Sequence, residues 1–267
     1  NVFIGVQAGQ AQTSASETVA IGVDALTSNV TGTQNCAVGF KALNDNTGNY
    51  NTSVGYRTMQ GNTSGGENAA FGRYAMYVNT TGSGNTALGN AALHQATTDF
   101  NTAAGYLALY SQTTGEQNTT VGAYAGYLVT TGVQNTAVGR DALRNATTAS
   151  YNTCVGRDSL YSATGGGNTA MGRNAGQNIS TGAHNSFFGY LAGGASGGTV
   201  TGSYNTGVGH LACSMLNGSG HSNTGVGTEA LRQLTTGTYN VAVGLSCTEY
   251  ATTAHSNVAM GYRALRN

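Results

Sequence analysis

Proline is absent from all 267 residues, although the chain contains 42 glycines. Proline has no backbone N–H, so its absence suits a chain in which nearly every N–H is needed for hydrogen bonding between strands. Many glycines are also typical of low-complexity chains. Here, however, 39% of the residues are hydrophobic and they recur in strict register. The composition therefore favours an ordered, strand-based structure.

Charge is scarce as well. Charged residues make up 7% of the chain, ten basic against ten acidic, and the net charge is zero. Nucleic acids and anionic membranes are bound by clusters of basic residues, so we expect neither as a partner. No hydrophobic run approaches the roughly eighteen residues that a membrane-spanning helix needs, so we expect no membrane span.

What the chain does contain is one short unit, repeated from end to end. The clearest copy covers residues 135–143 and reads NTAVGRDAL. With Asn135 as position 1, sixteen copies begin at Asn1, Thr18, Asn35, Asn51, Asn68, Asn85, Asn101, Asn118, Asn135, Asn152, Asn168, Asn185, Asn205, Asn223, Asn240 and Asn257. Successive copies are 16 or 17 residues apart, except for separations of 20 and 18 residues after Asn185 and Asn205. This period predicts one repeat domain over residues 1–267, with irregular longer coils near residues 193–222.

The columns of the aligned copies define the unit. Position 5 is glycine in every copy, as at Gly22, Gly39, Gly55, Gly72, Gly89, Gly105, Gly122, Gly139, Gly156 and Gly172. Position 1 is asparagine in every copy except Thr18, for example at Asn35, Asn101 and Asn135. Position 4 is always apolar, position 8 is always small, and position 9 is most often Leu or Met.

These columns predict the structure of one coil. Small and β-branched residues before a glycine indicate a short strand that ends in a turn. The following x-x-Ala-Leu predicts a second short strand or an extended corner, and a polar return leads to the next copy. We expect Val138 and Leu143 to point inward. One coil cannot bury them alone but a stack can, so we predict an all-β fold, a parallel β-solenoid (β-roll) of about sixteen coils of 16–17 residues.

The first strand also suggests self-association. Position 2 is small or β-branched, and position 3 is small in fourteen copies, the exceptions being Phe3 and Phe187. A strand with one face in water should show polar residues on that face, whereas a strand buried on both faces need not. We therefore expect the outward side of this strand to meet another copy of the chain, which would add apolar contact to a thin core.

Asparagine and threonine recur in register too. Position 1 asparagines in consecutive coils should stack, each side-chain amide bonding to the next. Thr-Thr pairs fill positions 13 and 14 in seven copies, five of them in succession from Thr80-Thr81 to Thr147-Thr148. Regular threonine arrays raise the hypothesis of ice binding. Adjacent residues of a strand point to opposite faces, however, and flat Thr-x-Thr columns are missing.

The four cysteines are Cys36, Cys154, Cys213 and Cys247, and no two share a column in adjacent coils. A bridge from Cys213 to Cys247 would span two coils, about 9 to 10 Å, which exceeds disulfide reach. We therefore predict free, mostly buried thiols. No CxxC or Cys/His metal spacing occurs, so the cysteines do not indicate a redox compartment or a metal site.

Candidate catalytic motifs arise from the repeat itself. Residues 194–198 fit G-x-S-x-G and residues 207–212 and 225–230 fit G-x-G-x-x-A, but no long strand leading into a helix surrounds them. The five histidines, His94, His184, His210, His221 and His255, do not form one shared column.

Four acidic residues do recur at position 7: Asp24, Asp141, Asp158 and Glu229. Asp141 and Asp158 occupy position 7 of adjacent coils beside Arg140 and Arg157, which predicts a solvated charge ladder or, as the alternative, a calcium site. We find no paired acid and base, and we predict a chain that is not an enzyme and needs no cofactor or metal.

The repeat resembles known fibre proteins. Residues 101–109, NTAAGYLAL, are similar to the Asn-Ser-x-Ala-Ile-Gly repeats of trimeric autotransporter adhesin heads, and closer still to the Asn-Thr-Ala-(Val/Ile)-Gly-Tyr-x-Ala-Leu arrays of phage tail-fibre and related surface-fibre proteins. The resemblance covers the whole chain. It implies a left-handed parallel β-roll, a parallel trimer, and a role as fibre shaft or adhesive head, outside the cell, on its surface or on a virion. The chain departs from the adhesin heads in its longer coil, and it lacks their coiled-coil stalk, membrane anchor and chaperone domain.

Other functions stay open. The chain begins in phase with the repeat, without an initiator Met, and neither end has an atypical cap. We therefore expect a processed product or a piece of a longer protein, with adjoining domains or end-to-end stacking into a filament. Eight sequons would suit a glycan-coated filament, at Asn29, Asn51, Asn62, Asn79, Asn118, Asn145, Asn178 and Asn217. Surface glycans or a host receptor are further expected partners, and a carbohydrate-binding solenoid is a less favoured alternative.

Overall fold

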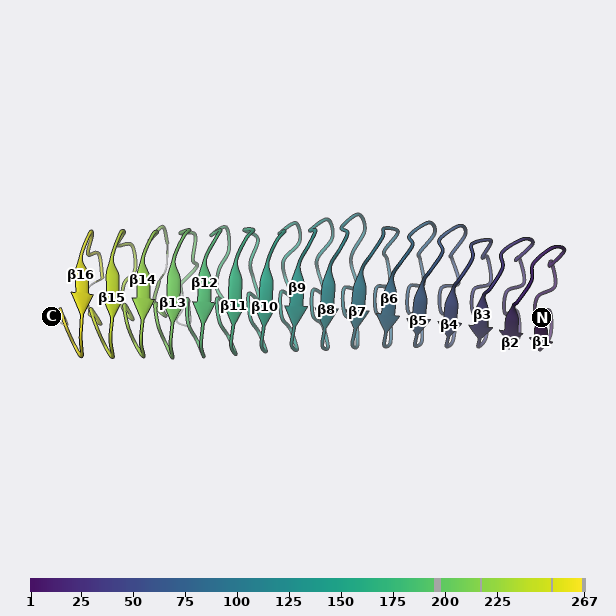
Figure 1. The fold of residues 1–267 in the computed structure, drawn as a ribbon, viewed down its shortest axis with the longest axis horizontal. Helices are drawn as coiled ribbons and strands as arrows, with labels where there is room; N and C mark the ends of the chain where they lie inside the picture. Colours follow the sequence, from purple (N-terminus) through teal and green to yellow (C-terminus); the bar gives the residue numbers. More distant parts are fainter. Residues whose placement is uncertain (195–197, 217, 251, 266–267) are drawn as a thin grey trace. The chain divides into compact units, whose positions relative to one another are not determined.

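A computed structural model gives the fold and describes residues 1–194, 198–216, 218–250 and 252–265. Within these ranges the regular secondary structure consists of sixteen three-residue strands, without any helix. The chain divides into two compact units, residues 1–134 and 135–267. Each unit is a stack of β-solenoid coils with one strand per coil (Figure 1). The all-β solenoid prediction is confirmed, whereas left-handed winding and a single domain over residues 1–267 stay predictions.

The strands of the first unit are β1 (Val2–Ile4), β2 (Val19–Ile21), β3 (Cys36–Val38), β4 (Thr52–Val54), β5 (Ala69–Phe71), β6 (Thr86–Leu88), β7 (Thr102–Ala104) and β8 (Thr119–Val121). Those of the second unit are β9 (Thr136–Val138), β10 (Thr153–Val155), β11 (Thr169–Met171), β12 (Ser186–Phe188), β13 (Thr206–Val208), β14 (Thr224–Val226), β15 (Val241–Val243) and β16 (Val258–Met260). Every strand is positions 2 to 4 of one repeat copy. Successive strands within a unit pair in parallel without a register shift, so equal positions lie side by side, as Thr102 does with Thr119.

The strand residue that points into the coil interior differs from the one predicted. Position 3 is the residue that points inward: Ala137 is fully buried, while Val138 at position 4 is only partly buried. The inward assignment of Val138 was therefore wrong. The coil interior is narrow, and the alanines of positions 3 and 8 together with the larger side chain of position 9 fill it. Leu143 at position 9 is fully buried, as predicted.

The segment after the glycine is a run of turns and not a second strand or an extended corner. Residues at positions 7 and 9 adopt left-handed backbone angles, as at Asp141 (φ 58°) and Leu143 (φ 52°). Alternating right- and left-handed residues reverse the chain within a few residues and still direct N–H groups along the stack. The N–H of Arg57 donates to Phe40 O in the preceding coil at 2.8 Å, and that of Met59 donates to Ala75 O in the following coil at 2.9 Å. Inter-coil hydrogen bonding therefore continues through the turn.

The irregular region near residues 193–222 rejoins the stack. Val200 is buried and forms parallel bridges with Ile179 and with Gly218. The longer coil therefore places Val200 over Ile179 of the preceding coil, so that the interior continues past the insertion. Residues 195–197 lie outside the described part of the chain, and with them most of the G-x-S-x-G match at residues 194–198.

Candidate functional site

The stacked asparagines of position 1 are the most regular polar feature of both units. Asn51 Oδ1 accepts hydrogen bonds from the backbone N and from Nδ2 of Asn68, both at 3.1 Å, while Asn51 Nδ2 donates to Gly65 O in its own coil at 2.8 Å. Asn101 and Asn135 repeat this arrangement, and both are buried. The predicted amide ladder is confirmed. Each asparagine ties one coil to the next and also closes its own coil, so the column is structural.

A second interior column of amides was missed. Position 12 is Asn29, Asn46, Asn62 and Asn79 in four successive coils, and all four are fully buried. Asn62 Nδ2 donates to Asn46 Oδ1 at 2.6 Å, and Asn79 Nδ2 donates to Asn62 Oδ1 at 2.8 Å. Among the described residues of the second unit the same column is apolar, with Ala146, Ala163, Ile179, Leu216 and Leu234. The four asparagines recur with the period of the repeat and were visible in the sequence, but they lay beyond the nine aligned positions.

The burial of these asparagines bears on whether the predicted sequons can carry glycans. Five of their asparagines have fully buried side chains: Asn29, Asn51, Asn62, Asn79 and Asn118. A glycan has no room in the closed interior of a folded coil, so these five sequons are incompatible with glycosylation of the folded chain. Asn145 and Asn178, at position 11, are partly exposed, and Asn217 lies outside the described residues.

The glycines of position 5 stack as closely as backbones can. At Gly139 a Cβ atom would lie 2.5 Å from Gly156 O in the next coil, and the φ of Gly139 is +134°, a region that side chains rarely adopt. Gly22 and Gly105 have the same conformation and face the corresponding glycine carbonyl of the next coil. Close approach and backbone angle together explain the invariant column.

The outward side of each sheet is formed by positions 2 and 4. Position 4 gives an apolar column, from Ile4 to Val121 in the first unit and from Val138 to Met260 in the second. Phe71 and Leu88 of this column are 42% and 43% exposed. Position 2 is threonine in nine copies, and none of these nine hydroxyls makes a hydrogen bond within the described part of the chain. This mixed threonine and apolar face, hereafter the strand face, has no charged residue at positions 2 and 4 of either unit.

The Thr-Thr pairs contribute hydrogen bonds between successive coils. Several position 13 hydroxyls of the pairs donate along the stack. Thr97 donates to Thr113 O and Thr113 donates to Thr130 O, both at 3.2 Å, and Thr235 donates to Thr252 O at 2.8 Å. These hydroxyls supplement the backbone ladder at the polar return. The hydroxyls of Thr97, Thr113 and Thr235 are engaged in these contacts, so the pairs do not present a regular array of free hydroxyls for ice binding.

Aromatic rings form a second unpredicted feature of the first unit. Positions 6, 7 and 10 place rings of successive coils against one another, with neighbouring centroids 4.8 to 5.7 Å apart. In order of contact this ring chain consists of Phe40, Tyr56, Tyr74, Tyr77, His94, Tyr110, Tyr127, Tyr124 and Tyr106. Burial between the tyrosines lowers the pKa of His94. The ring contacts stabilise the coil edge.

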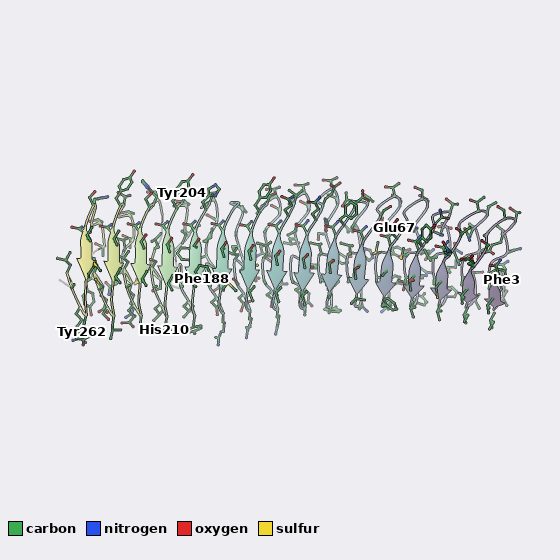
Figure 2. All side chains as sticks on the ribbon, in the orientation of Figure 1. Phe3, Glu67, Phe188, Tyr204, His210 and Tyr262 are labelled. Carbon is green, nitrogen blue, oxygen red and sulfur yellow. The ribbon has the colours of Figure 1, made fainter. Side chains whose placement is uncertain are left out.

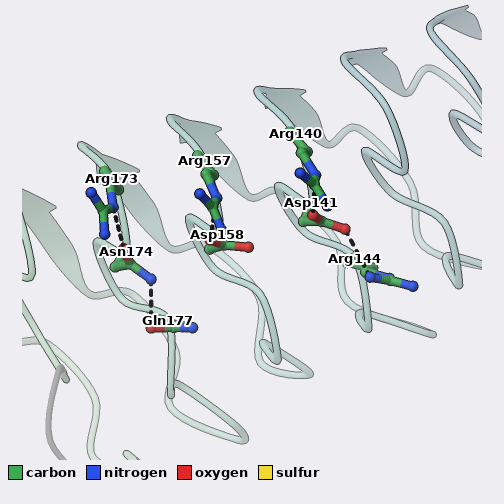
Figure 3. A network of polar contacts seen from close by, with 8 residues as sticks. All are labelled: Arg140, Asp141, Arg144, Arg157, Asp158, Arg173, Asn174 and Gln177. Carbon is green, nitrogen blue, oxygen red and sulfur yellow. Dashed lines mark hydrogen bonds and ion pairs between the residues drawn. The ribbon is translucent and has the colours of Figure 1, made fainter.

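The predicted charge ladder at Asp141 and Asp158 is paired within each coil (Figure 3). Arg140 Nε and Arg144 lie 3.0 and 2.8 Å from the two carboxylate oxygens of Asp141, and Arg157 Nε lies 2.9 Å from Asp158. The coil after Asp158 has two amides in place of Asp141 and Arg144: Arg173 Nε donates to Asn174 Oδ1, and Asn174 Nδ2 donates to Gln177 Oε1. An amide replaces the carboxylate without a change of contacts, so the arrangement braces the turn and does not depend on a bound cation.

The cysteines and histidines considered as candidate functional groups do not lie together in one site. Cys36, Cys154, Cys213 and Cys247 are all free, as predicted. Burial raises the pKa of Cys213 to about 12 and also raises the pKa of Cys154, so these thiols stay protonated and unreactive. His210 stacks on Tyr190 and His221 packs edge-on to Tyr239, so the two histidines have separate partners.

The dinucleotide-type motif has no binding site around it. Strand β13, at the first G-x-G-x-x-A match, leads into a turn and not into a phosphate-binding helix. The described residues contain no group of three or more His, Cys, Asp or Glu side chains placed to hold a metal ion. In the same ranges no helix has the length and apolar character needed to cross a membrane. Comparison with protein-family models and with curated proteins finds no match to this chain.

Proposed function

We propose that the chain is a structural element, a non-enzymatic shaft of a fibre displayed outside the cell or on a virion. The regular positions of the repeat support this proposal. Position 1 asparagines, position 5 glycines and the small residues of positions 3 and 8 all act in stacking one coil on the next. The positions that vary from copy to copy, such as 6, 10 and 11, lie on the surface, where a fibre can change its contacts without loss of the fold.

The observation that carries the proposal is the apolar column of the strand face. Each coil contributes one apolar side chain, and in register these side chains form a row along the stack of each unit. Continuous apolar patches mark association surfaces, whereas scattered exposed apolar residues do not. We propose that copies of the chain pack through this column, with a parallel trimer as the favoured assembly. The position 2 threonines would flank the contact and keep their hydroxyls in water, since burying them without partners is costly.

Sedimentation or native mass measurement tests this association. Phe71→Lys and Leu88→Lys place charges in the apolar column of the first unit and should convert an oligomer to a monomer with an unchanged circular dichroism spectrum. Val78→Lys is the matched control, because Val78 is similarly exposed, at 40%, but lies at position 11, outside the strand face. A wild-type chain that is monomeric at high concentration would refute the shared-face shaft.

Adhesion, a host receptor and filament formation belong to the same proposal as finer alternatives. Electron micrographs of the isolated chain distinguish discrete particles from long end-to-end filaments. Intact mass of the native protein, compared with the sequence mass of 26.9 kDa, reveals any glycan on Asn145 or Asn178. Binding to cells or to immobilised glycans would favour an adhesive head over a plain shaft.

Ice binding is a second candidate, favoured by the nine position 2 threonines and not by the paired threonines. Threonine hydroxyls repeat along the strand face at the spacing of successive strands, about 4.8 Å, beside an apolar column. Ice-recrystallisation assays test this candidate, and Thr102→Lys should abolish activity. Wild-type protein without effect on ice growth would eliminate it and leave the shaft proposal untouched.

A further inference from the structure

A groove crosses the polar returns of four successive coils in the first unit. It has a volume of about 490 Å³ and is open to solvent. Its ends are marked by Tyr50 and Phe100, and Glu67 and Gly84 lie between them in the two intervening coils. Volumes in this range are typical of small-molecule sites.

The groove arises from the last residue of each coil. Tyr50, Glu67, Gly84 and Phe100 all have left-handed φ angles, between 58° and 66°, so they occupy equivalent places in four consecutive coils. The row begins and ends with a large ring and has a carboxylate and a glycine in the middle. Four strands that are about 4.8 Å apart place the two rings roughly 14 Å from each other along the stack.

Both rings present open faces. Tyr50 is 56% exposed and Phe100 is 63% exposed, and in the described residues neither ring stacks on another aromatic side chain. The Phe100 ring rests on Gly84, where a Cβ atom would lie only 2.8 Å from Phe100 Cδ1. The backbone therefore supports one side of the ring and leaves the rest to solvent. Rings in the ring chain are covered by their neighbours: the ring centroids of His94 and Tyr110, for example, lie 4.8 Å apart in a stacked arrangement.

The polar lining complements the rings. Glu67 is exposed, and its carboxylate has no hydrogen-bond or ion-pair partner within the described ranges (Figure 2). Thr47, Asn49, Ser64 and Ser83 add hydroxyl and amide groups. Asn49 Oδ1 is engaged by Thr33 N at 2.8 Å, which holds this side chain in place. The lining contains one acidic and no basic side chain, so it disfavours phosphate, sulfate and uronate groups.

The geometry points to an oligosaccharide site, with Tyr50 and Phe100 as stacking platforms and Glu67 as the acceptor for hydroxyl or amino groups of a neutral or amino-sugar chain. Sugar rings have C–H faces that pack on aromatic rings and edges rich in hydroxyls, which matches open rings at both ends of a polar floor. An elongated ligand would lie along the stack and touch all four coils. The groove is on the polar returns and not on the strand face, so its occupancy is separable from self-association.

A glycan array probed with the purified full chain tests the site. It should include neutral, amino-sugar and acidic oligosaccharides of several lengths, and hits should be titrated by calorimetry. We expect binding of neutral or amino-sugar chains and not of acidic ones. Tyr50→Ala and Phe100→Ala should each weaken binding by about tenfold or more. Tyr50→Phe should retain it, and Glu67→Gln should weaken amino-sugar chains more than neutral ones.

Tyr106→Ala is the matched control, because Tyr106 is a partly exposed tyrosine of the same unit, 49% exposed, in the ring chain away from the groove. This variant should bind as wild type. No binding of any neutral or amino-sugar oligosaccharide at millimolar concentration would overturn the inference. So would wild-type affinity in both alanine variants, or a preference for acidic chains.

Discussion

The ring of Phe187 fills the space that a side chain at Gly193 would occupy. A Cβ atom on Gly193 would overlap that ring, and Gly207 of the next coil is also close to it. The coil of residues 135–151 has a small residue at position 3, Ala137, and a large one at position 9, Leu143. In the coil of Phe187 the large residue is at position 3 and the small one, Gly193, is at position 9. Phe3 and Gly9 repeat the exchange, because a Cβ on Gly9 would lie 2.7 Å from Phe3 Cε1.

This exchange predicts a double-mutant cycle. Phe187→Ala should reduce the free energy of unfolding by about 3 to 5 kcal/mol, because it leaves a cavity beside two glycines. Gly193→Leu alone should destabilise by overpacking. The double variant Phe187→Ala/Gly193→Leu restores the usual pair and should recover most of the loss. Denaturant unfolding of the four proteins measures the coupling, and additive effects would contradict the exchange.

The position 5 glycines predict a contrast between two equal substitutions. Gly156→Ala places a Cβ 2.5 Å from Gly172 O at a φ of +131°, so strain and steric overlap act together. Gly261 also has a positive φ, +120°, but nothing lies within 4 Å of its Cβ position. We expect Gly156→Ala to cost about 2 to 4 kcal/mol of unfolding free energy and Gly261→Ala about 1 kcal/mol. Thermal unfolding of both variants checks this, and equal losses would refute the role of close stacking.

The sequence predicted the stacking of coils accurately, because each contact between coils requires one residue type at one position of every copy. A column that only glycine can occupy indicates backbones in close contact, and a column of asparagines indicates side-chain amides bonded from coil to coil. The parallel solenoid and the amide ladder of Asn35, Asn101 and Asn135 followed from them. The period alone also located the irregular coils near residues 193–222.

The facing of the strand could not be predicted in the same way. Val138 was assigned to the interior as the apolar residue of the strand, but the narrow coil places Ala137 inward beside Leu143. The hydrophobicity of the strand residues therefore indicated the wrong inward residue, because the small volume of the coil interior decides which side chain fits. The ring chain and the oligosaccharide groove depend on side-chain directions at left-handed residues such as Tyr50, which strand alternation does not describe.

Thr18 interrupts the amide ladder, and this interruption predicts a stabilising substitution. Thr18 is buried at position 1, but its hydroxyl donates to Ser16 O at 3.0 Å and offers the next coil no acceptor. Thr18→Asn should accept from Asn35 N and donate to Asn1 Oδ1, and so raise the free energy of unfolding by about 1 kcal/mol. The reverse change, Asn68→Thr, should lower it by about 1 to 3 kcal/mol. A neutral or destabilising Thr18→Asn in urea unfolding would show that the ladder adds no stability there.

His94 makes stability depend on pH. Its ring lies 5.4 Å from Tyr77 and 4.8 Å from Tyr110, and burial lowers its pKa below the usual 6.5. The unfolded chain then takes up a proton more readily than the folded one, so this contribution is present above about pH 6.5 and is lost as pH falls below that value. His94→Tyr keeps an aromatic ring in the ring chain and removes the titration. We expect the variant to lose less stability than wild type between about pH 7.5 and about pH 5, as measured by urea unfolding. His210→Tyr, which replaces a histidine stacked on Tyr190, is the control and should retain the wild-type loss. If His94→Tyr and wild type lost stability equally over this range, the buried imidazole would not be the source.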